Sequence, residues 1–515
     1  MKRLILLLLL SPIACTSIPF KKVKPNENVQ DETKEDPTIS SVRGAASKLT
    51  TLNDPNTDTQ PSLPTLIESF FQTPSEISSL KEALHIHSNT AEMKTFLQTT
   101  RRALHRKPEL MYELPTTSNT IQSILTELDI KYTTGWAKNT HPDVYPGTGG
   151  YGIVAHIGTM SPTQPCLILR ADMDALPILE STPHIETFKS TQDGKMHACG
   201  HDGHVTMLLG AAALLKKMES EIEGTVRLVF QPAEEGGAGM KRMVEEGVVS
   251  LSPEAKLGFG MHVWPGLPTG TIAAKPGTQM AAAEMFEITI IGKGGHAAMP
   301  HLTIDPIVTA SSLILNLQSI ISRTISPLDS GVISVTAMNA GDAFNVIPAH
   351  AVIKGTIRAL TEEMLLSLRQ KVDDMAHNTA TVHQCNVTIS YSPDYYLPSI
   401  NDPTLFPWSK SVGELVSHEG IVRDVEATMG GEDFAFLANE IPSTFFLLGQ
   451  GSGGEHNMEN YAVPRTDYGL HHPSFALDEE VLPIGVELHV NLALRGLKKL
   501  LMGEDGDDES IAEEL

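Results

Sequence analysis

The chain has little cysteine and few aromatic side chains for its length. It holds 4 Cys in 515 residues, and Phe, Trp and Tyr together make up 5%. Cys15 lies in an apolar N-terminal segment, so Cys166, Cys199 and Cys385 are left, and three thiols do not make a disulfide framework. A single Cys166–Cys385 bridge stays open, although no spacing favours it. Since 515 residues exceed what one hydrophobic core organises, we expect two globular domains with tails.

Basic side chains are also scarce. The sequence has 38 Lys and Arg against 62 Asp and Glu, and its formal net charge is −24. No basic stripe offsets this charge, so we expect no nucleic acid among the partners. Part of the acidity lies in residues 504–515, which we expect to form a solvated, disordered tail. Beyond the N-terminus, no stretch is apolar enough to predict a membrane-spanning helix.

The N-terminus carries a short apolar run. MKRLILLLLLSPIACTS places two cations before apolar residues and small residues after them, which is the pattern of a secretory signal peptide, assigned to residues 1–20. Cys15 leaves a lipid-anchored form open, although Pro12 stands where such a signal favours Leu. Residues 21–84 are polar and rich in Pro, Ser and Thr, and we expect a flexible leader there. The chain is therefore expected in the secretory pathway, whether secreted, periplasmic or lumenal.

Residues 85–279 alternate between helix and buried-strand patterns. Helices are predicted around 91–106, before Pro108, and at 116–128, where Thr or Ser is expected as the cap. Apolar runs predict buried strands at 152–157, 166–171, 225–230 and 257–263, with an Ala- and Leu-rich helix at 205–218. This alternation is typical of an α/β domain whose mostly parallel sheet is covered on both faces.

Residues 280–392 follow a different order of elements. Strand and helix patterns succeed one another as β-α-β-β-α-β, the ferredoxin-like order. Asp305, followed by Pro306, and Thr361 are expected to begin its two helices. We therefore predict a small α+β domain inserted into the α/β domain, which residues 393–503 complete.

Reactive side chains follow three of the predicted buried strands. Asp172 and Asp174 come after the strand at 166–171, Glu234 and Glu235 follow the strand at 225–230, and His262 lies at the end of the strand at 257–263. In open α/β sheets the carboxyl ends of the strands are where sites are built. These side chains are therefore expected to meet at one edge of the sheet.

The stretch HACGHDGH, residues 197–204, is expected to join them there. Cys199 and His201 lie at or just before a helix N-terminus, which favours a thiolate, and a metal ion would favour it more strongly. His197, Asp202 and His204 are then candidates for orienting the ligands.

Each of these signals also has a plain structural interpretation. Cys199 and His201 alone could be a buried thiol beside a capping histidine, and His262 could be a hydrogen-bonded core residue. The glutamate pair could be a solvated acidic turn, and DMDALP could be a turn capped by aspartate. Because all of them fall at the same predicted edge, we favour a metal centre.

The two adjacent glutamates are expected to take different roles. If the backbone is extended, their side chains point in opposite directions. One carboxylate could bind metal while the other acts as a general base on water whose pKa a divalent cation has lowered. The spacing does not say which glutamate does which.

The motifs together resemble a known family. LRADMDALP, HACGHDGH, FQPAEEGGAGM, GMHVWP, GKGGHAAMP, FNVIP with GTIR, GGEDFAFL and LHHPSF occur in this order over roughly 90–500. They resemble the metallopeptidase M20 clan, and within it the amidohydrolase branch of hippurate hydrolase, bacterial aminoacylases and carboxypeptidases, and plant auxin–amino acid conjugate hydrolases. The leader and the acidic tail lie outside the resemblance.

The resemblance implies two divalent ions, often manganese or zinc. Carried over to this sequence, the implied ligands are Cys199, His201, Glu235, His262 and His471. In the family's Leu-His-x-Pro pattern His471 is the ligand and His472 fills the variable place. Glu234 would be the general base and Asp174 a partner that supports the ligands.

The resemblance also implies roles for the inserted domain, a lid in this family. It assigns substrate contacts to His296, Asn345 and Arg358. A donor such as His296 suits a tetrahedral oxyanion, and an arginine fork suits a substrate carboxylate. In relatives some lid residues serve the neighbouring subunit, so a homodimer through the lid is expected.

The expected function is hydrolysis of N-acyl-amino acids by metal-activated water. A carboxypeptidase or dipeptidase with the same site is the alternative enzyme, distinguished by accepting substrates with a free amino terminus. A binding protein that lost turnover is a third interpretation, although neither Glu234 nor any implied ligand is missing.

Overall fold

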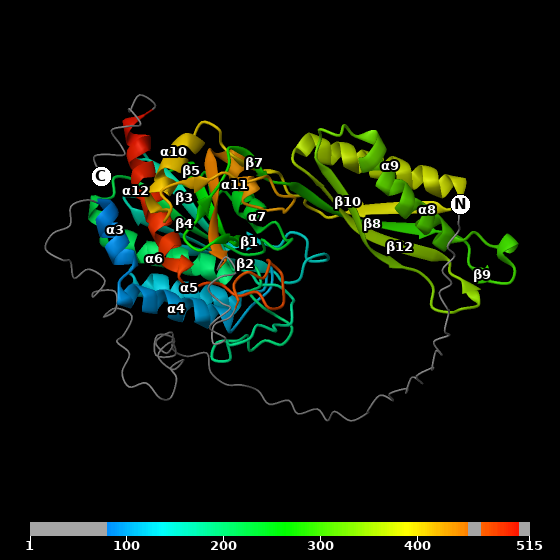
Figure 1. The fold of residues 1–515 in the computed structure, drawn as a ribbon, viewed down its shortest axis with the longest axis horizontal. Coiled ribbons are helices and arrows are strands. Elements are labelled where there is room, and N and C mark those ends of the chain that lie inside the picture. The colour runs from blue at the N-terminus through cyan, green and yellow to red at the C-terminus, as the bar shows by residue number, and fades with distance from the viewer. Residues whose placement is uncertain (1–79, 452–464, 504–515) are drawn as a thin grey trace, which may run out of the picture. The chain divides into compact units, whose positions relative to one another are not determined.

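The larger domain is built on an eight-stranded sheet. In the computed structural model, residues 80–451 and 465–503 are described, and helices and strands are labelled as in Figure 1. The order of strands is β1-β2-β4-β3-β5-β16-β6-β15. Their bounds are Lys131–Lys138 (β1), Gly149–Gly158 (β2), Cys166–Asp172 (β3), Thr225–Gln231 (β4), Ala255–Pro268 (β5), Ile272–Ala273 (β6), Val422–Arg423 (β15) and Ser443–Gly451 (β16). The neighbours β4-β3-β5-β16 run parallel, whereas β1 and β2 add antiparallel strands at one edge. The predicted mostly parallel sheet is confirmed.

The central strands are buried along their whole length. Every residue of β3, β4 and β16 is buried, which explains why these segments appear in the sequence as continuous apolar runs. Arg170 in β3 and Arg227 in β4 interrupt the runs, and both side chains are almost fully buried.

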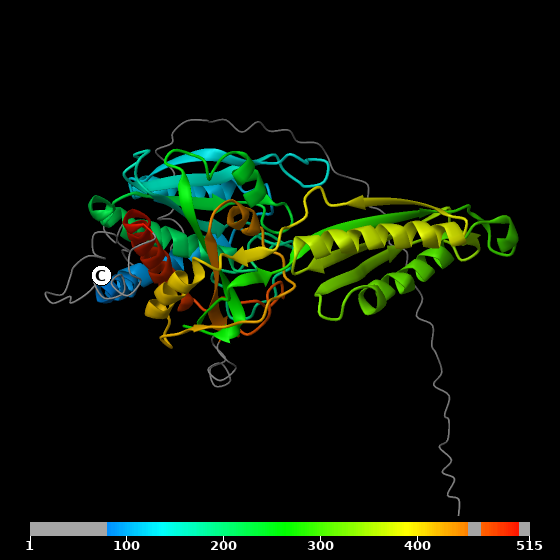
Figure 2. The same cartoon turned by 90° about the horizontal axis from the view of Figure 1, so that it is seen from above.

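Helices cover both faces of this sheet (Figure 2). One face packs in a single apolar cluster against α4, α5, α6, α10 and α12, and the other packs against α7 and α11. The helix bounds are Leu80–Ser88 (α3), Ala91–His105 (α4), Pro115–Glu127 (α5), His201–Lys217 (α6), Gly239–Glu245 (α7), Phe406–Val416 (α10), Ala435–Glu440 (α11) and Val481–Met502 (α12). Helix α6 is buried from His201 to Leu215 between α4 and α12, so its N-terminus is held firmly against the sheet.

The inserted lid domain has the predicted ferredoxin-like fold. Its sheet has the order β10-β12-β8-β13, and its two long helices lie along one face of it (Figure 1). The bounds are Ala282–Ile291 (β8), Pro306–Ser319 (α8), Gly331–Asn339 (β10), His350–Ala359 (β12), Glu362–Val382 (α9) and Asn386–Tyr391 (β13). The side chains of Asp305 and Thr361 accept backbone N–H groups at the starts of α8 and α9, as expected.

Short strands complete the chain's connections. The ribbon of β9 (Gly295–His296) and β11 (Val346–Ile347), with the loops beside it, is called the lid tip below. Strands β7 (Gly277–Met280) and β14 (Ser399–Asn401) pair with each other where the chain enters and leaves the lid domain.

Two local predictions are wrong. Helix α5 begins at Pro115 with no side-chain cap from Thr or Ser, because the carboxylate of Glu109 accepts the backbone N–H groups of Thr116 and Thr117 instead. The predicted leader extends to residue 84, but α3 begins at Leu80, where the buried Leu84 joins the large apolar cluster.

Several predictions fall outside the described residues. The signal peptide with Cys15, most of the leader and the acidic tail at 504–515 belong to this group. Cys166, Cys199 and Cys385 are free thiols, and no bridge joins Cys166 to Cys385. Within the part of the chain that the structure describes, no helix combines the length and the apolar character that crossing a membrane requires.

Candidate metal centre

The HACGH stretch brings two candidate ligands to the N-terminus of α6. Cys199 lies just before the helix, His201 is its first residue, and Gly200 between them has a left-handed φ of 91°. A Cβ on Gly200 would lie 2.4 Å from Cγ2 of Val263, so both the conformation and the space require glycine. The sharp turn at Gly200 directs the Cys199 and His201 side chains toward the carboxyl ends of the strands.

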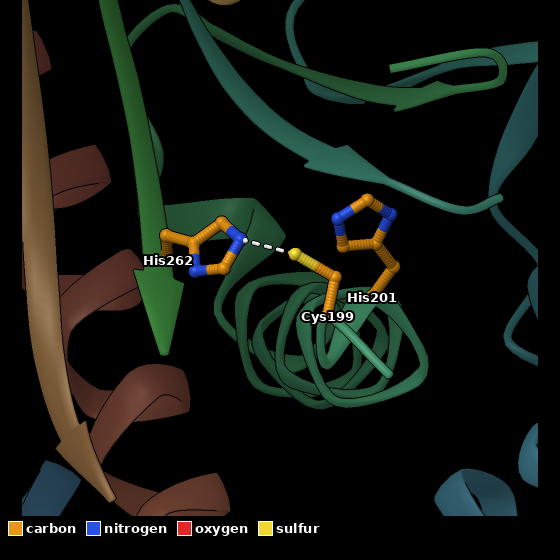
Figure 3. Close-up of side chains that lie close together, drawn as sticks. All are labelled: Cys199, His201 and His262. Atoms are coloured by element: carbon orange, nitrogen blue, oxygen red, sulfur yellow. Dashed lines mark hydrogen bonds between the residues drawn. The ribbon is translucent and has the colours of Figure 1, made fainter. Parts of the chain in front are cut away.

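Cys199 meets His262 at this edge. The Sγ atom lies 3.3 Å from Nε2 of His262, which projects from β5 (Figure 3). The other ring nitrogen, Nδ1, donates to the carbonyl oxygen of Val263 at 2.7 Å. That bond fixes the tautomer and leaves Nε2 with a free lone pair toward Cys199, the state in which imidazole binds metals.

The two glutamates lie on a tight turn after β4. Asp174 accepts the backbone N–H of Glu234 at 3.0 Å and that of Glu235 at 3.1 Å. The Oε2 atom of Glu234 and the Oε1 atom of Glu235 each lie 4.0 Å from Nε2 of His201. Asp174 therefore holds the backbone of the turn, while the carboxylates of Glu234 and Glu235 both face His201.

The structure distinguishes between the two adjacent histidines of LHHPSF. Nε2 of His471 lies 3.2 Å from Oε1 of Glu235, and His471 itself has a left-handed φ of 64°. His472 stacks on Tyr468, and its Nδ1 accepts the N–H of Ser474. His471 is therefore the histidine that faces the cluster.

These side chains form overlapping groups that could hold metal ions. Ligand atoms lie within 4.8 Å of one another in five sets. Three contain the implied ligands, namely Cys199 with His201 and His262, Cys199 with Glu235 and His471, and His201 with Glu234 and Glu235; the other two are Asp172 with His201 and His204, and Glu234 with Glu432 and Asp433. Among the described residues, both ring nitrogens of His201 are buried and make no hydrogen bond of normal geometry, and the buried Oε1 of Glu235 has only the contact with Nε2 of His471. Buried polar atoms are normally paired, so these atoms are suited to binding a cation.

Negative charge is in excess around this cluster. The carboxylates at the edge include Asp172, Asp174, Glu234, Glu235, Glu432 and Asp433, all buried or nearly so. Arg170 makes ion pairs with Asp172 at 2.7 Å and with Glu432 and Asp433 at 2.9 Å. One guanidinium does not balance this many carboxylates, and buried charge is costly unless it is paired. The cluster therefore favours an added cation.

The acid–base behaviour of the cluster follows from the same excess. Burial raises the pKa of the Cys199 thiol well above its ordinary value, and Glu235 and Glu234 raise it further. Burial alone would lower the pKa of His201, but Asp172 and Asp174 raise it to about 10. Burial, with Glu432 and Glu235, raises the pKa of the Glu234 carboxyl well above its usual range. A divalent cation at the cluster would oppose each of these three shifts.

Of the three polar residues that were candidates for orienting the ligands, two make structural contacts and the third makes no hydrogen bond through its ring within the described part of the chain. Nδ1 of His204 lies 2.6 Å from Asp172, and its Nε2 accepts the N–H of Val263, so His204 fixes the strand beside His262. Asp202 pairs with Arg101 at 2.9 Å and with His105 at 2.8 Å on α4, so the expectation that it orients the ligands is wrong. His197 is buried and has no hydrogen-bond partner for its ring among the described residues.

The cluster opens into a cavity of about 300 Å³. Its walls include Cys199, Glu234, Glu235, His262, Trp264, Met280, Met285, Arg358, Tyr396, Leu470 and His471. Arg358, on β12 of the lid domain, donates from Nη1 to the carbonyl oxygen of Met429 at 2.8 Å. The cavity thus has candidate ligands, apolar side chains and a guanidinium in its walls.

The other two lid residues lie elsewhere. His296 and Asn345 are both at the lid tip, where the N–H of Ala297 donates to the carbonyl oxygen of Asn345. Both side chains are exposed, and neither belongs to the cavity wall. The structure therefore brings Arg358 to the cavity and leaves His296 and Asn345 apart from it.

Sequence reasoning missed the carboxylates that surround Arg170. Glu432 and Asp433 lie in the quoted motif GGEDFAFL but were given no role, and Arg170 was counted within an apolar strand. Gln231 also contacts both Arg170 and Asp433. An arginine inside an otherwise apolar strand was the available signal, because a buried guanidinium requires acidic partners.

Comparisons with known proteins agree with this architecture. The model of peptidase family M20/M25/M40 matches residues 168–495. IAA-amino acid hydrolase ILR1-like 2 from Arabidopsis thaliana is 40% identical over 82% of this chain and 90% of its own length. N-acetylcysteine deacetylase from Bacillus subtilis is 37% identical over 78% of this chain and 96% of its own.

A solved structure is similar over the same span. The YXEP protein of Bacillus subtilis, described as a dinuclear metal binding peptidase from the M20 family, is 34% identical with a TM-score of 0.60. The match covers 79% of this chain and 98% of that one. The family model, the relatives and the fold agree, and the chain belongs to peptidase family M20/M25/M40 and is a hydrolase.

Proposed function

We propose that the protein hydrolyses the amide bond of N-acyl-amino acids with the help of two divalent cations. The observation that carries this proposal is the convergence of Cys199, His201, Glu235, His262 and His471 on one end of a cavity that also contains Arg358. Two relatives support the substrate class, because their names describe an IAA-amino acid hydrolase and an N-acetylcysteine deacetylase.

The side chains suit a pair of cations. The His201 ring nitrogens without hydrogen bonds and the excess of carboxylates both favour positive charge there. The solved relative is described as dinuclear, and a mixed thiolate, imidazole and carboxylate set suits manganese or zinc. When bound, such cations supply Lewis-acid polarisation of the scissile carbonyl and make water more acidic.

Glu234 is proposed as the general base. Its carboxylate faces the ligand cluster and lies outside the ligand set that the family resemblance implies, so in this proposal it remains free to hold a proton. Glu234 would accept the proton of the attacking water and pass it to the leaving amine. Asp174 holds the backbone of both glutamates and so fixes the distance between base and ligands.

Arg358 is proposed to bind the carboxylate of the amino-acid part. Its guanidinium is partly buried in the cavity wall, and a planar fork binds a carboxylate through two parallel hydrogen bonds. The apolar walls formed by Trp264, Met280, Met285 and Leu470 are suited to an aliphatic or aromatic acyl group.

The lid tip is proposed to act on the cavity of a second copy in a homodimer. His296 and Asn345 are exposed and lie outside the cavity wall of their own chain. Around them the apolar side chains of Met299, Leu302, Phe344 and Val346 are exposed, and Phe344 is fully so. An exposed apolar patch of this kind is typical of an interface, and His296 would then stabilise the oxyanion from the partner.

The experiment is a panel of N-acyl-amino acids tested on chelator-treated protein with manganese or zinc restored. We expect release of free amino acid only after metal is added, and faster release from substrates with apolar acyl groups. If no substrate of the panel is cleaved although two metal ions bind per chain, the amidohydrolase proposal is wrong and a binding protein is favoured.

The alternative enzyme is a carboxypeptidase or dipeptidase. The solved relative's description as a peptidase favours it, and the same cluster and Arg358 would serve peptides. The panel therefore includes matched dipeptides with free and acylated amino termini. Faster cleavage of the free form would favour this alternative.

We also propose that residues 1–20 direct the chain into the secretory pathway. The support is the sequence pattern of two cations, an apolar run and small residues. Expression of the full chain followed by N-terminal sequencing of the secreted product tests it, and a Cys15→Ser variant separates cleavage of a plain signal from lipid anchoring.

A further inference from the structure

The proposed base lies on a turn with an unusual backbone. In this glutamate turn, residues 233–238, three positions have positive φ: Ala233 at 59°, Gly236 at 97° and Ala238 at 54°. Alanine is disfavoured in the left-handed region, so a turn with two such alanines requires support from its surroundings. Asp174 supports only its middle, through the N–H groups of Glu234 and Glu235.

The hydroxyl of Tyr396 supports most of the rest of the turn, and the hydroxyl of Tyr112 donates to the carbonyl oxygen of Gly237 at 2.6 Å. The Tyr396 hydroxyl donates to the carbonyl oxygen of Glu234 at 2.5 Å and accepts the N–H groups of Gly236 at 3.0 Å and Ala238 at 3.1 Å. One donor and two acceptor sites are all that a hydroxyl has, so every site is used on this turn. The ring is buried and packs edge-on against Phe436, which holds the hydroxyl in place.

Tyr396 also belongs to the connection that leaves the lid domain. Its backbone forms two hydrogen bonds with Ala283 at the start of the lid strand β8, at 2.8 and 3.1 Å. Tyr396 therefore lies where the chain leaves the lid domain, paired with Ala283 where the chain enters it, and its hydroxyl bonds the turn that carries Glu234.

The neighbours of Tyr396 extend this connection in both directions. The hydroxyl of Tyr395 donates to Oε1 of Glu362, the first residue of the lid helix α9, at 2.5 Å. Asp394 forms ion pairs with Lys241 and Arg242 on α7, the helix that follows the glutamate turn. Residues 394–396 thus contact both the lid helix and the segment that carries the base.

We propose that Tyr396 is a positioning residue for Glu234, which sets the conformation of the glutamate turn from the base of the lid domain. Tyr396 acts through the main chain of the turn and does not itself exchange a proton with substrate. This inference rests on the proposed role of Glu234 as general base. It adds a residue outside the ligand set to the catalytic arrangement, together with a physical path by which movement of the lid domain reaches the base.

The first experiment compares Tyr396→Phe with the full-length wild type. Phe keeps the packing against Phe436 but removes the acceptor of the Ala238 amide and the donor to the Glu234 carbonyl oxygen, so the turn loosens; the Gly236 amide keeps its bond to that carbonyl oxygen. We expect kcat to fall about tenfold to a hundredfold, because small displacements of a catalytic group have effects of this size. KM and the number of metal ions bound per chain should stay unchanged.

The control is Tyr391→Phe. Tyr391 donates its hydroxyl to Asp373 at 2.7 Å within the lid domain, so this variant removes a partly buried, hydrogen-bonded hydroxyl away from the turn. We expect its kcat to equal that of the wild type. An equal fall in both variants would mean that general loosening of the protein, and not the glutamate turn, is responsible.

A double-mutant cycle separates positioning from ordinary stability. If Tyr396 acts through Glu234, adding Tyr396→Phe to Glu234→Gln should lower the residual rate little further, because the base is already absent. A full additional fall in the double variant would overturn the inference while leaving Glu234 as the base. Full activity of Glu234→Gln alone would instead overturn the proposed function.

If Tyr396→Phe does not fold, 4-aminophenylalanine at position 396 takes its place in the same cycle. Its amino group keeps a donor at the hydroxyl position and accepts only weakly, so kcat should lie between those of the wild type and the base variant. A wild-type kcat would show that acceptance of the Gly236 and Ala238 amides is dispensable and would overturn the inference. A reduced kcat that is fully additive with Glu234→Gln would overturn it as well.

Discussion

The edge of the large sheet and the lid tip assemble their polar residues in different ways. At the edge, side chains from β3, α6, β4 and β5 are buried and held by neighbours, as Asp174 holds the glutamate pair and Val263 holds His262. At the lid tip, His296 lies on the short strand β9 and Asn345 directly precedes the short strand β11; both side chains are exposed and neither lines the cavity. The edge of the large sheet brings its candidate ligands together within one chain, whereas the lid-tip residues lie outside the cavity wall of that chain, which is why we propose that they act on a second copy.

The sharpest test of the site edge is Glu234→Gln. Gln keeps the shape of the side chain but does not accept a proton, so we expect kcat to fall by about a hundredfold to ten-thousandfold. Metal content, measured by elemental analysis, should be retained because Glu234 is outside the proposed ligand set. A kcat close to that of the wild type would remove Glu234 from its proposed role.

His296→Ala tests whether the lid tip contributes to catalysis at all. Loss of a single oxyanion donor lowers kcat by about a hundredfold to a thousandfold, and we expect an effect of this size with unchanged metal binding.

Mixing two inactive variants tests where the lid tip acts. If His296 serves the partner, an equal mixture of the His296→Ala and Glu234→Gln variants should regain roughly a quarter of wild-type activity. Half of the dimers would then contain one copy of each variant, and one of the two sites in each of these mixed dimers would be intact. No recovery in a mixture whose subunits demonstrably exchange would place His296 in its own chain's site and would contradict the proposed role of the lid tip in a second copy.

Arg358→Ala tests the one lid residue that the structure places in the cavity wall. A hydrogen bond to a charged group contributes about 1.5–3 kcal/mol, so we expect KM to rise roughly tenfold to a hundredfold with little change in kcat. Substrates whose carboxylate is replaced by an amide should show no such rise. A fall in kcat alone would contradict the carboxylate-binding role.

The smallest expected effect is a difference in metal affinity between the variants His471→Ala and His472→Ala. His471→Ala should weaken metal binding at least about tenfold, because even residues behind the ligands contribute 10- to 100-fold. His472→Ala is the matched control and should bind metal normally, since His472 stacks on Tyr468 instead of facing Glu235. Equal metal affinities in the two variants would remove His471 from the ligand set.

The contrast also explains what the sequence could and could not predict. Cys199, His201, Glu234 and His262 were placed correctly at one edge because each lies at the end of a buried strand or the start of a helix, and parallel strands bring such ends together. The resemblance, and not the spacing, distinguished Glu234 from Glu235. Arg358 was assigned by the resemblance too, and its place in the cavity wall depends on where the lid domain joins the larger one.

Contacts made by packing were beyond the sequence. Asp202 was expected to orient ligands, but it faces Arg101 and His105 because α4 packs against α6 at that turn. The role of Tyr396 depends on its hydroxyl reaching the amide of Gly236, which lies 160 residues away in the sequence. No local sequence pattern encodes such a contact. Helix α5 lacks its expected cap for a similar reason, because Glu109 reaches its first amides.

The most direct test of the central claim is the anomalous scattering of crystals grown with manganese. We predict two strong peaks in each chain, each within bonding distance of side chains from the set Cys199, His201, Glu235, His262 and His471. The two ions should share at least one of these ligands or be bound by neighbouring ones. Peaks elsewhere, or no peak at this cluster in crystals of catalytically active protein, would contradict it.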